Sequence, residues 1–169
     1  MRPTVKYAAF TAGLVIVFKL TVYISGNAIT KLGSYSNLLS LLIIFPMVFI
    51  TLKSMRDKEL GGYMRTGTAM KAGLGFAAVL SVLLALYTYI NFAFIDHETL
   101  PYILNEADKL AIEQKMDARQ IDEMRSTWKE FYSPFKQATL ALLQTIIATS
   151  LMAFICSTFV VRNPPNEMN

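Results

Sequence analysis

Hydrophobic and polar positions divide this chain into four long apolar segments separated by shorter charged ones. Residues 72–95 and 137–161 contain 24 and 25 residues without a charged side chain, and residues 32–52 add a run of 21. Residues 7–24 are interrupted only by Lys19. A helix rises about 1.5 Å per residue and the hydrocarbon core is about 30 Å thick, so about 20 apolar residues can span it. The pattern therefore predicts a polytopic membrane protein.

The predicted fold class is all-α: a membrane bundle of four transmembrane helices in a single domain over residues 1–169. We expect these helices at about 5–25, 36–52, 66–95 and 134–161. Between the third and the fourth, residues 98–132 predict an extramembrane amphipathic helical hairpin. A soluble bundle would need a polar face on each helix, whereas residues 38–52 are apolar nearly all round.

Each helix of the expected hairpin carries one apolar stripe at helical spacing. The stripe of the first helix comprises Ile103, Ala107, Leu110 and Gln114, flanked by Leu104 and Ala111. The stripe of the second, with spacings of 3, 4 and 3 residues, comprises Ile121, Met124, Trp128 and Phe131. Asp117 and Gln120 predict a capping box where the second helix begins. The stripes could contact the membrane surface, each other or another protein.

The placement of basic residues bears on orientation and on partners. The net charge is +4, but no single basic block of the kind that binds nucleic acid is present, so no nucleic-acid partner is expected. Both sides of the bundle carry equal numbers of basic residues, but only those at the chain ends and between the second and third segments are concentrated in short flanks. Basic residues close to membrane ends determine orientation most strongly. We therefore predict cytoplasmic termini and an external hairpin. Gly26-Asn27-Ala28 is a poor signal-cleavage site, so we expect the first segment to be retained as an anchor.

Lys19 is the charged residue that lies well inside an apolar segment. A lysine at mid-bilayer costs roughly 2.5 to 3.5 kcal/mol on insertion scales. Three interpretations stay open: the side chain reaches outward to the headgroups, pairs with an acid such as Asp96, or takes part in transport or a proton relay. In the second segment, Pro46 predicts a kink that serves either packing or gating.

No constellation of residues indicates a reaction, so we expect a non-enzymatic protein with no catalytic, cofactor-binding or metal-ligating residues. His97, the sole histidine, is interpreted as part of a solvated helix end, because neither a second histidine nor a cysteine supports a metal site. Cys156, the sole cysteine, cannot form an intrachain disulfide and is interpreted as a small packing residue.

Small residues recur every four positions in two of the apolar segments. They are Ala69, Gly73 and Ala77 in the third segment and Ala9 and Gly13 in the first. Such spacing lets helices approach closely in lipid. It predicts helix packing within the bundle or dimerisation, and the pattern alone does not separate the two.

Several short motifs, in this order, resemble an uncharacterised family of small bacterial four-helix integral membrane proteins, defined by a domain of unknown function. They are Lys6-Tyr7, Ala12-Gly13-Leu14, Gly61-Gly62-Tyr63 before Gly67, Ala69-Met70-Lys71-Ala72-Gly73, Phe94-Ile95-Asp96 and Ser133-Pro134. Members often have proline after the aspartate, where this chain has His97. The resemblance covers nearly the whole chain and implies a multi-pass protein of the bacterial inner membrane with an external hairpin. It implies no reaction.

Two functional hypotheses follow. The leading one is a non-enzymatic accessory or scaffold subunit that binds membrane lipids and a partner, either another membrane or periplasmic protein or a second copy. The alternative is a small homodimeric transporter whose pathway is lined by polar residues of the first helix: Lys19, Thr11, Thr21 and Tyr23. This alternative requires those side chains to face a common cavity. An intramembrane enzyme ranks third, because no Ser/His or carboxylate pair lies within the apolar segments.

Overall fold

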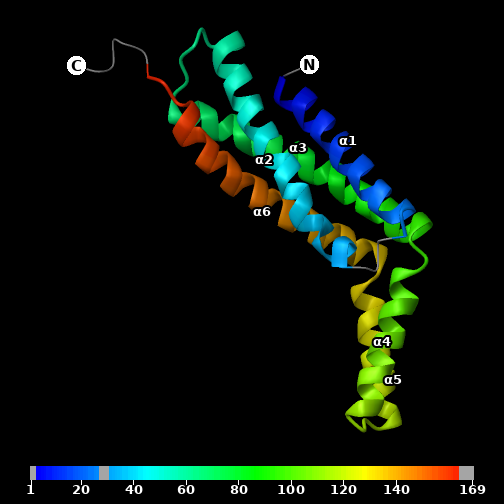
Figure 1. Ribbon diagram of the computed structural model, residues 1–169. Coiled ribbons are helices and arrows are strands. Elements are labelled where there is room, and N and C mark those ends of the chain that lie inside the picture. The colour runs from blue at the N-terminus through cyan, green and yellow to red at the C-terminus, as the bar shows by residue number, and fades with distance from the viewer. Residues whose placement is uncertain (1–2, 27–30, 164–169) are drawn as a thin grey trace.

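The computed structural model describes residues 3–26 and 31–163, and the elements it contains there are helices (Figure 1). In chain order they are α1 (Pro3–Ile24), α2 (Lys31–Glu59), α3 (Thr66–Ile90), the π-helix η1 (Asn91–Ile95), α4 (Thr99–Glu113), α5 (Ala118–Phe131) and α6 (Pro134–Val160). The expected all-α class is confirmed. The one extended pairing in the described ranges is an isolated antiparallel bridge between Met64 and Arg162.

Four helices are long and apolar enough to cross a membrane. They cover Pro3–Ile24, Leu38–Glu59, Thr66–Ile95 and Pro134–Val160. The second helix continues past the predicted end at residue 52, because the charged residues that follow are good helix formers. It stops before Gly61 and Gly62, whose φ angles of 63° and 90° favour glycine. Charge marks the edge of the apolar run, whereas the glycine pair marks the end of the helix.

Helices α1, α2, α3 and α6 form a bundle in which α3 packs against α6 and α1, and α2 packs against α1 and α6 (Figure 1). At one end of the bundle, called here the terminal end, lie the start of α1, the connection between α2 and α3, and the end of α6. Helices α4 and α5 lie side by side and project from the opposite end, called here the hairpin end. The bundle therefore has two chemically distinct ends.

The half of the bundle nearer the terminal end is closely packed. Its buried apolar residues are Ala8, Ala12 and Val15 of α1, Val48 and Leu52 of α2, Ala69, Phe76 and Leu80 of α3, and Ala153, Cys156 and Val160 of α6. Gly73 of α3 lies directly against Ala153, so that a Cβ added to the glycine would come within 3.0 Å of the alanine Cβ. Small residues thus permit the close approach of α3 and α6.

Polar contacts fasten the terminal end. The backbones of Met64 and Arg162 exchange hydrogen bonds of 2.9 and 3.1 Å, which join the start of α3 to the end of α6. The buried Arg56 of α2 donates from Nη1 to the Val160 carbonyl oxygen at 3.2 Å and from Nε to Asp57 Oδ1 at 2.6 Å. Arg56 therefore satisfies a carbonyl at the end of α6, which has no partner within its own helix.

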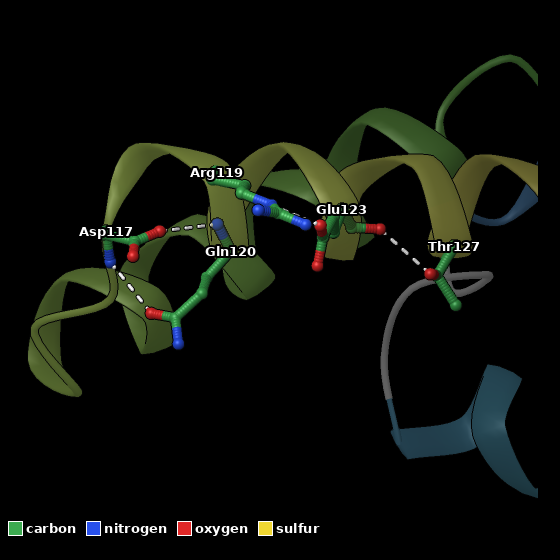
Figure 2. A network of polar contacts seen from close by, with 5 residues as sticks. All are labelled: Asp117, Arg119, Gln120, Glu123 and Thr127. Atoms are coloured by element: carbon green, nitrogen blue, oxygen red, sulfur yellow. Dashed lines mark hydrogen bonds and ion pairs between the residues drawn. The ribbon is translucent and has the colours of Figure 1, made fainter.

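A bidentate ion pair links α4 and α5. Arg125 Nε and Nη2 donate to the carboxylate oxygens of Asp108 at 2.8 and 2.6 Å. The predicted capping box is confirmed: Asp117 Oδ1 accepts from the Gln120 backbone at 2.8 Å, and Gln120 Oε1 accepts from the Asp117 backbone at 3.0 Å (Figure 2). Farther along α5, Figure 2 shows Glu123 accepting from the Arg119 side chain and from the Thr127 hydroxyl.

The stripe predicted for α4 was partly wrong. Ala107 and Ala111 are buried, whereas Leu110 is 54% exposed and Gln114 is also exposed. Two alanines one turn apart let α4 approach its neighbour more closely than leucine would. On α5, Ile121, Met124 and Trp128 are half-buried, as the predicted stripe requires, and Phe131 is 43% exposed.

Candidate functional site

The half of the bundle nearer the hairpin end encloses a cavity of about 720 Å³. All four bundle helices line it, together with η1 and the ends of α4 and α5 next to the bundle. Val15, Ile44 and Leu84 belong both to its lining and to the packed core, so they form the floor that separates the two halves. The volume falls within the ~300 to 1,000 Å³ typical of small-molecule sites. This cavity is the candidate functional site.

Polar side chains from every bundle helix reach this cavity. They are Lys19 and Tyr23 of α1, Ser36 and Ser40 of α2, Tyr87 and Thr88 of α3, Asn91 of η1, and Gln137, Gln144 and Thr145 of α6. Some hydroxyls already bond to their own helices, since Ser40 donates to the Ser36 carbonyl and Thr88 to the Leu84 carbonyl. The lining also contains amides from η1 and α6 and the Lys19 ammonium, and the Gln137 amide donates to the Phe131 carbonyl at 3.0 Å. Groups of this kind can donate to a ligand that carries hydrogen-bond acceptors.

Lys19 and Asp96 are the charged residues among those that line the cavity. Asp96 holds the start of α4: its Oδ1 accepts from the Thr99 backbone at 3.0 Å and its Oδ2 from the Thr99 hydroxyl at 2.7 Å. This carboxylate therefore acts as a local cap at the cavity mouth. Lys19 of α1 is also half-buried, and it supplies the cationic group of the lining.

A π-helix forms one wall of the cavity. η1 follows α3 without a break, and Tyr23 of α1 donates from its hydroxyl to the Ile95 carbonyl at 2.8 Å. The Tyr87 hydroxyl and Asn91 Oδ1 lie 3.4 Å apart on the same wall. Single-turn π-helices occur frequently at functional sites because their wider turn redirects side chains and frees backbone groups. This one places Asn91 on the cavity surface.

Aromatic rings surround the cavity mouth. Trp128, Phe131 and Tyr132 contact one another with ring centroids 5.4 to 6.2 Å apart, and Phe92 of η1 lies 6.3 Å from Tyr132. Phe131 and Tyr132 also line the cavity. Burial raises the pKa of the Tyr132 hydroxyl, so at neutral pH it remains protonated and able to donate a hydrogen bond. Aromatic side chains therefore form part of the cavity lining near the hairpin end.

The small residues singled out in the sequence lie in two different environments. Ala69, Gly73 and Ala77 are buried inside the bundle. Ala9 and Gly13 are exposed, and a Cβ added to Gly13 would meet no atom within 4 Å. The motif in α3 therefore serves packing within the chain, whereas the motif in α1 faces outward.

The four polar residues of α1 singled out in the sequence also lie in two different environments. Lys19 and Tyr23 line the cavity. Thr11 is buried and bonds to the Tyr7 carbonyl, and the exposed Thr21 bonds to the Val17 carbonyl. Two of the four groups required by the transporter hypothesis therefore share a cavity, and the two threonines lie outside its lining. His97 is exposed near the mouth, and Cys156 is buried in the packed half.

Sequence reasoning missed the cavity contributions of α2 and α6. The signal was present, because Ser36 and Ser40 are four residues apart and Gln137 and Gln144 are seven apart, which places each pair on one helix face. Within the described ranges, no group of three or more His, Cys, Asp and Glu residues is arranged to hold a metal ion.

The chain thus combines four helices long and apolar enough to cross a membrane with a cavity lined by polar side chains near one end of the bundle. Residues 6–162 match the family model described as protein of unknown function (DUF4199), and the chain belongs to this family. No curated protein and no solved structure matches the chain. The family assignment agrees with the motif resemblance.

Proposed function

We propose that the protein is a non-enzymatic integral membrane protein that binds a small anionic amphiphile in the cavity at its hairpin end. One observation carries the proposal: Lys19 lines a cavity of all four bundle helices among hydroxyl and amide groups, while Asp96, the acidic residue of the lining, accepts hydrogen bonds from Thr99. A carboxylate would accept hydrogen bonds from these donors and pair with the lysine. Leu41, Leu84 and Leu140 also line the cavity and suit an alkyl chain.

Matched short-chain amphiphiles test the proposal. Octanoate, octylamine and octanol share a chain and differ in charge, and each would be added below its micellar concentration to protein in mild detergent. We expect octanoate to raise the melting temperature and octylamine to leave it unchanged. A ligand present at about 100 times its Kd stabilises the folded state by about 2.7 kcal/mol.

Two variants of Lys19 provide the controls. Lys19→Met should fold at least as well as the wild type, because it removes a charged group from a membrane-length helix, and it should lose the octanoate response. Lys19→Arg keeps the charge and should retain the response. If octylamine stabilises the protein as well as octanoate does, or if Lys19→Met keeps the full octanoate response, the proposal of an anionic ligand is refuted.

Access to the cavity from the hairpin end can be tested separately with single-cysteine variants in a Cys156→Ser background. Ala141→Cys lies at a half-buried position that lines the cavity, whereas Leu143→Cys lies at a position that does not line it, is 48% exposed and would face lipid. A membrane-impermeant maleimide should label the first variant from the hairpin side and spare the second, because a thiol in lipid is not ionised. Equal labelling of both would contradict an aqueous cavity. Transport of the ligand would additionally require the packed half to open.

A second candidate is the accessory subunit that binds a partner protein. It is favoured by the apolar side chains that α4 leaves uncovered, Leu110 at 54% and Ile112 at 73% exposure. A photo-crosslinking residue at position 112 should then capture one partner, with position 119 on the charged outer face as the control. A strictly monomeric species without a crosslinked or co-purifying protein would count against this candidate.

The proposed location is the bacterial inner membrane with both termini in the cytoplasm. Support comes from the basic residues in the short flanks at the terminal end, which are Lys6, Lys53, Arg56, Lys58, Arg65 and Arg162. Positively charged flanks remain on the cytoplasmic side. A carboxyl-terminal alkaline phosphatase fusion should be inactive and a green fluorescent protein fusion should fluoresce; the reverse result would invert the orientation.

A further inference from the structure

A second hollow lies at the terminal end, between the start of α1 and the end of α2. This groove, of about 580 Å³, is lined by Pro3, Lys6, Tyr7, Phe10, Ser54, Lys58 and Glu59. It shares no residue with the cavity at the hairpin end. We propose that this groove binds the headgroup of an anionic phospholipid.

The charges of the groove favour an anionic occupant. Lys6 and Lys58 are exposed and belong to different helices, so their ammonium groups border the groove from both walls. Glu59 also lines it and opposes an anion, which leaves the lysines in excess by one charge. A phosphate bound here would neutralise that excess, and lysines near a membrane surface are attracted to anionic lipid headgroups.

Hydroxyl groups and an aromatic ring complete the match to a lipid. Tyr7 Oη and Ser54 Oγ lie 3.1 Å apart and join the two helices within the groove. Either hydroxyl can donate to a phosphate oxygen. One turn farther into the apolar part of α1, Phe10 is 60% exposed on the side that lipid would cover. The groove thus presents cations at its outer end and an aromatic surface where an acyl chain begins.

The location of the groove favours a lipid headgroup over a soluble phosphate as its ligand. Both helices that form the groove are membrane-length, and the groove lies where α1 begins and α2 ends. A groove at the ends of two membrane-length helices would lie at headgroup depth. A lipid headgroup there is held near the lysines by the bilayer itself, whereas a free phosphate would have to be captured from water.

Native mass spectrometry of the full chain in mild detergent tests the proposal. Phosphatidylglycerol and phosphatidylcholine with identical oleoyl chains would be titrated separately, with glycerol phosphate as a soluble comparison. We expect selective retention of phosphatidylglycerol and no retention of glycerol phosphate. The Lys6→Ala Lys58→Ala variant should bind phosphatidylglycerol roughly 25-fold more weakly, about fivefold for each lysine.

Two single variants separate the groove from the general attraction of a basic surface. Lys71→Ala removes an exposed lysine near the same end that does not line the groove, and it should change the affinity little. Glu59→Gln should strengthen binding, because it removes the opposing carboxylate. Equal retention of the two phospholipids, or equal losses in Lys71→Ala and the double variant, would overturn the proposal. Both outcomes are independent of the octanoate response at the other end.

Discussion

The contact between Gly73 and Ala153 offers the sharpest test of the packing. Gly73→Ala adds a methyl group that would come within 3.0 Å of the Ala153 Cβ, a separation that real Cβ atoms essentially never show. Helices α3 and α6 must then move apart, and overpacking of this kind costs typically 1 to 3 kcal/mol, here taken as ~3 because backbone must shift. Alanine is favoured over glycine in a helix by about 1 kcal/mol. We expect a net loss of about 2 kcal/mol.

The rescue variant follows from the same geometry. The next atom that the new methyl would meet is Ala153 Cα at 3.6 Å, which is ordinary van der Waals contact. Ala153→Gly removes the clashing Cβ, so the Gly73→Ala Ala153→Gly double variant should recover most of the stability. Gly13→Ala is the matched control: no atom lies within 4 Å of its Cβ position, so the substitution should be neutral or stabilising by up to about 1 kcal/mol.

The melting temperature of each variant is measured in mild detergent, with size-exclusion chromatography used to monitor unfolding. A loss of about 2 kcal/mol corresponds to a decrease in melting temperature of roughly 4 to 8 °C for a chain of this size. The reasoning is refuted if Gly73→Ala is as stable as the wild type. Failure of Ala153→Gly to rescue it would show that the loss has another cause.

Three further predictions concern single polar groups. Arg56→Ala should lower the unfolding free energy by about 1.5 to 3 kcal/mol, because it removes the donor to the Val160 carbonyl, while Lys53→Ala on the exposed surface should not. Lys115 has a φ of 55°, so Lys115→Gly should increase amide-exchange protection in α4 and α5, and Lys115→Val should decrease it. The hydrogen bond from Arg125 holds the pKa of Asp108 below its ordinary value. The stability it contributes is therefore present above about pH 4 and lost as pH falls through the lower folded-state pKa, and amide-exchange protection should fall less in Asp108→Asn than in the wild type.

The bundle could be predicted because long charge-free runs have one favourable environment. The capping box of Asp117 and Gln120 could be predicted because it depends on residues three apart. The environment of a small-residue motif could not: Ala9 and Gly13 have the same spacing as Ala69 and Gly73, yet one pair faces outward and the other is buried. That difference depends on how each helix is rotated, which is decided by contacts between segments far apart in the chain.

Hydrophobicity also misled the assignment of the α4 stripe. Leucine scores above alanine, but Leu110 is exposed and Ala111 is fully buried, because close helix approach favours the smaller side chain. The π-helix at Asn91–Ile95 could not be predicted either, because the apolar run continues through it without a change in composition. Polar residues of α2 and α6 carried a readable spacing, but their convergence on one cavity required the positions of all four helices.

The two halves of the bundle follow from the sizes of the residues that face its interior. On α6, Ala153, Cys156 and Ser157 are buried in the packed half, and their small side chains allow α3 to approach. Toward the hairpin end, the residues of α6 that face inward include Gln137 and Gln144, which line a cavity. An anchor would gain from replacing such groups, and above all the half-buried Lys19, by apolar residues. The packed half also buries polar side chains, among them Thr11, Thr51 and Arg56, but these lie within close packing. The amides and Lys19 instead line an open volume, which is the arrangement typical of a ligand site.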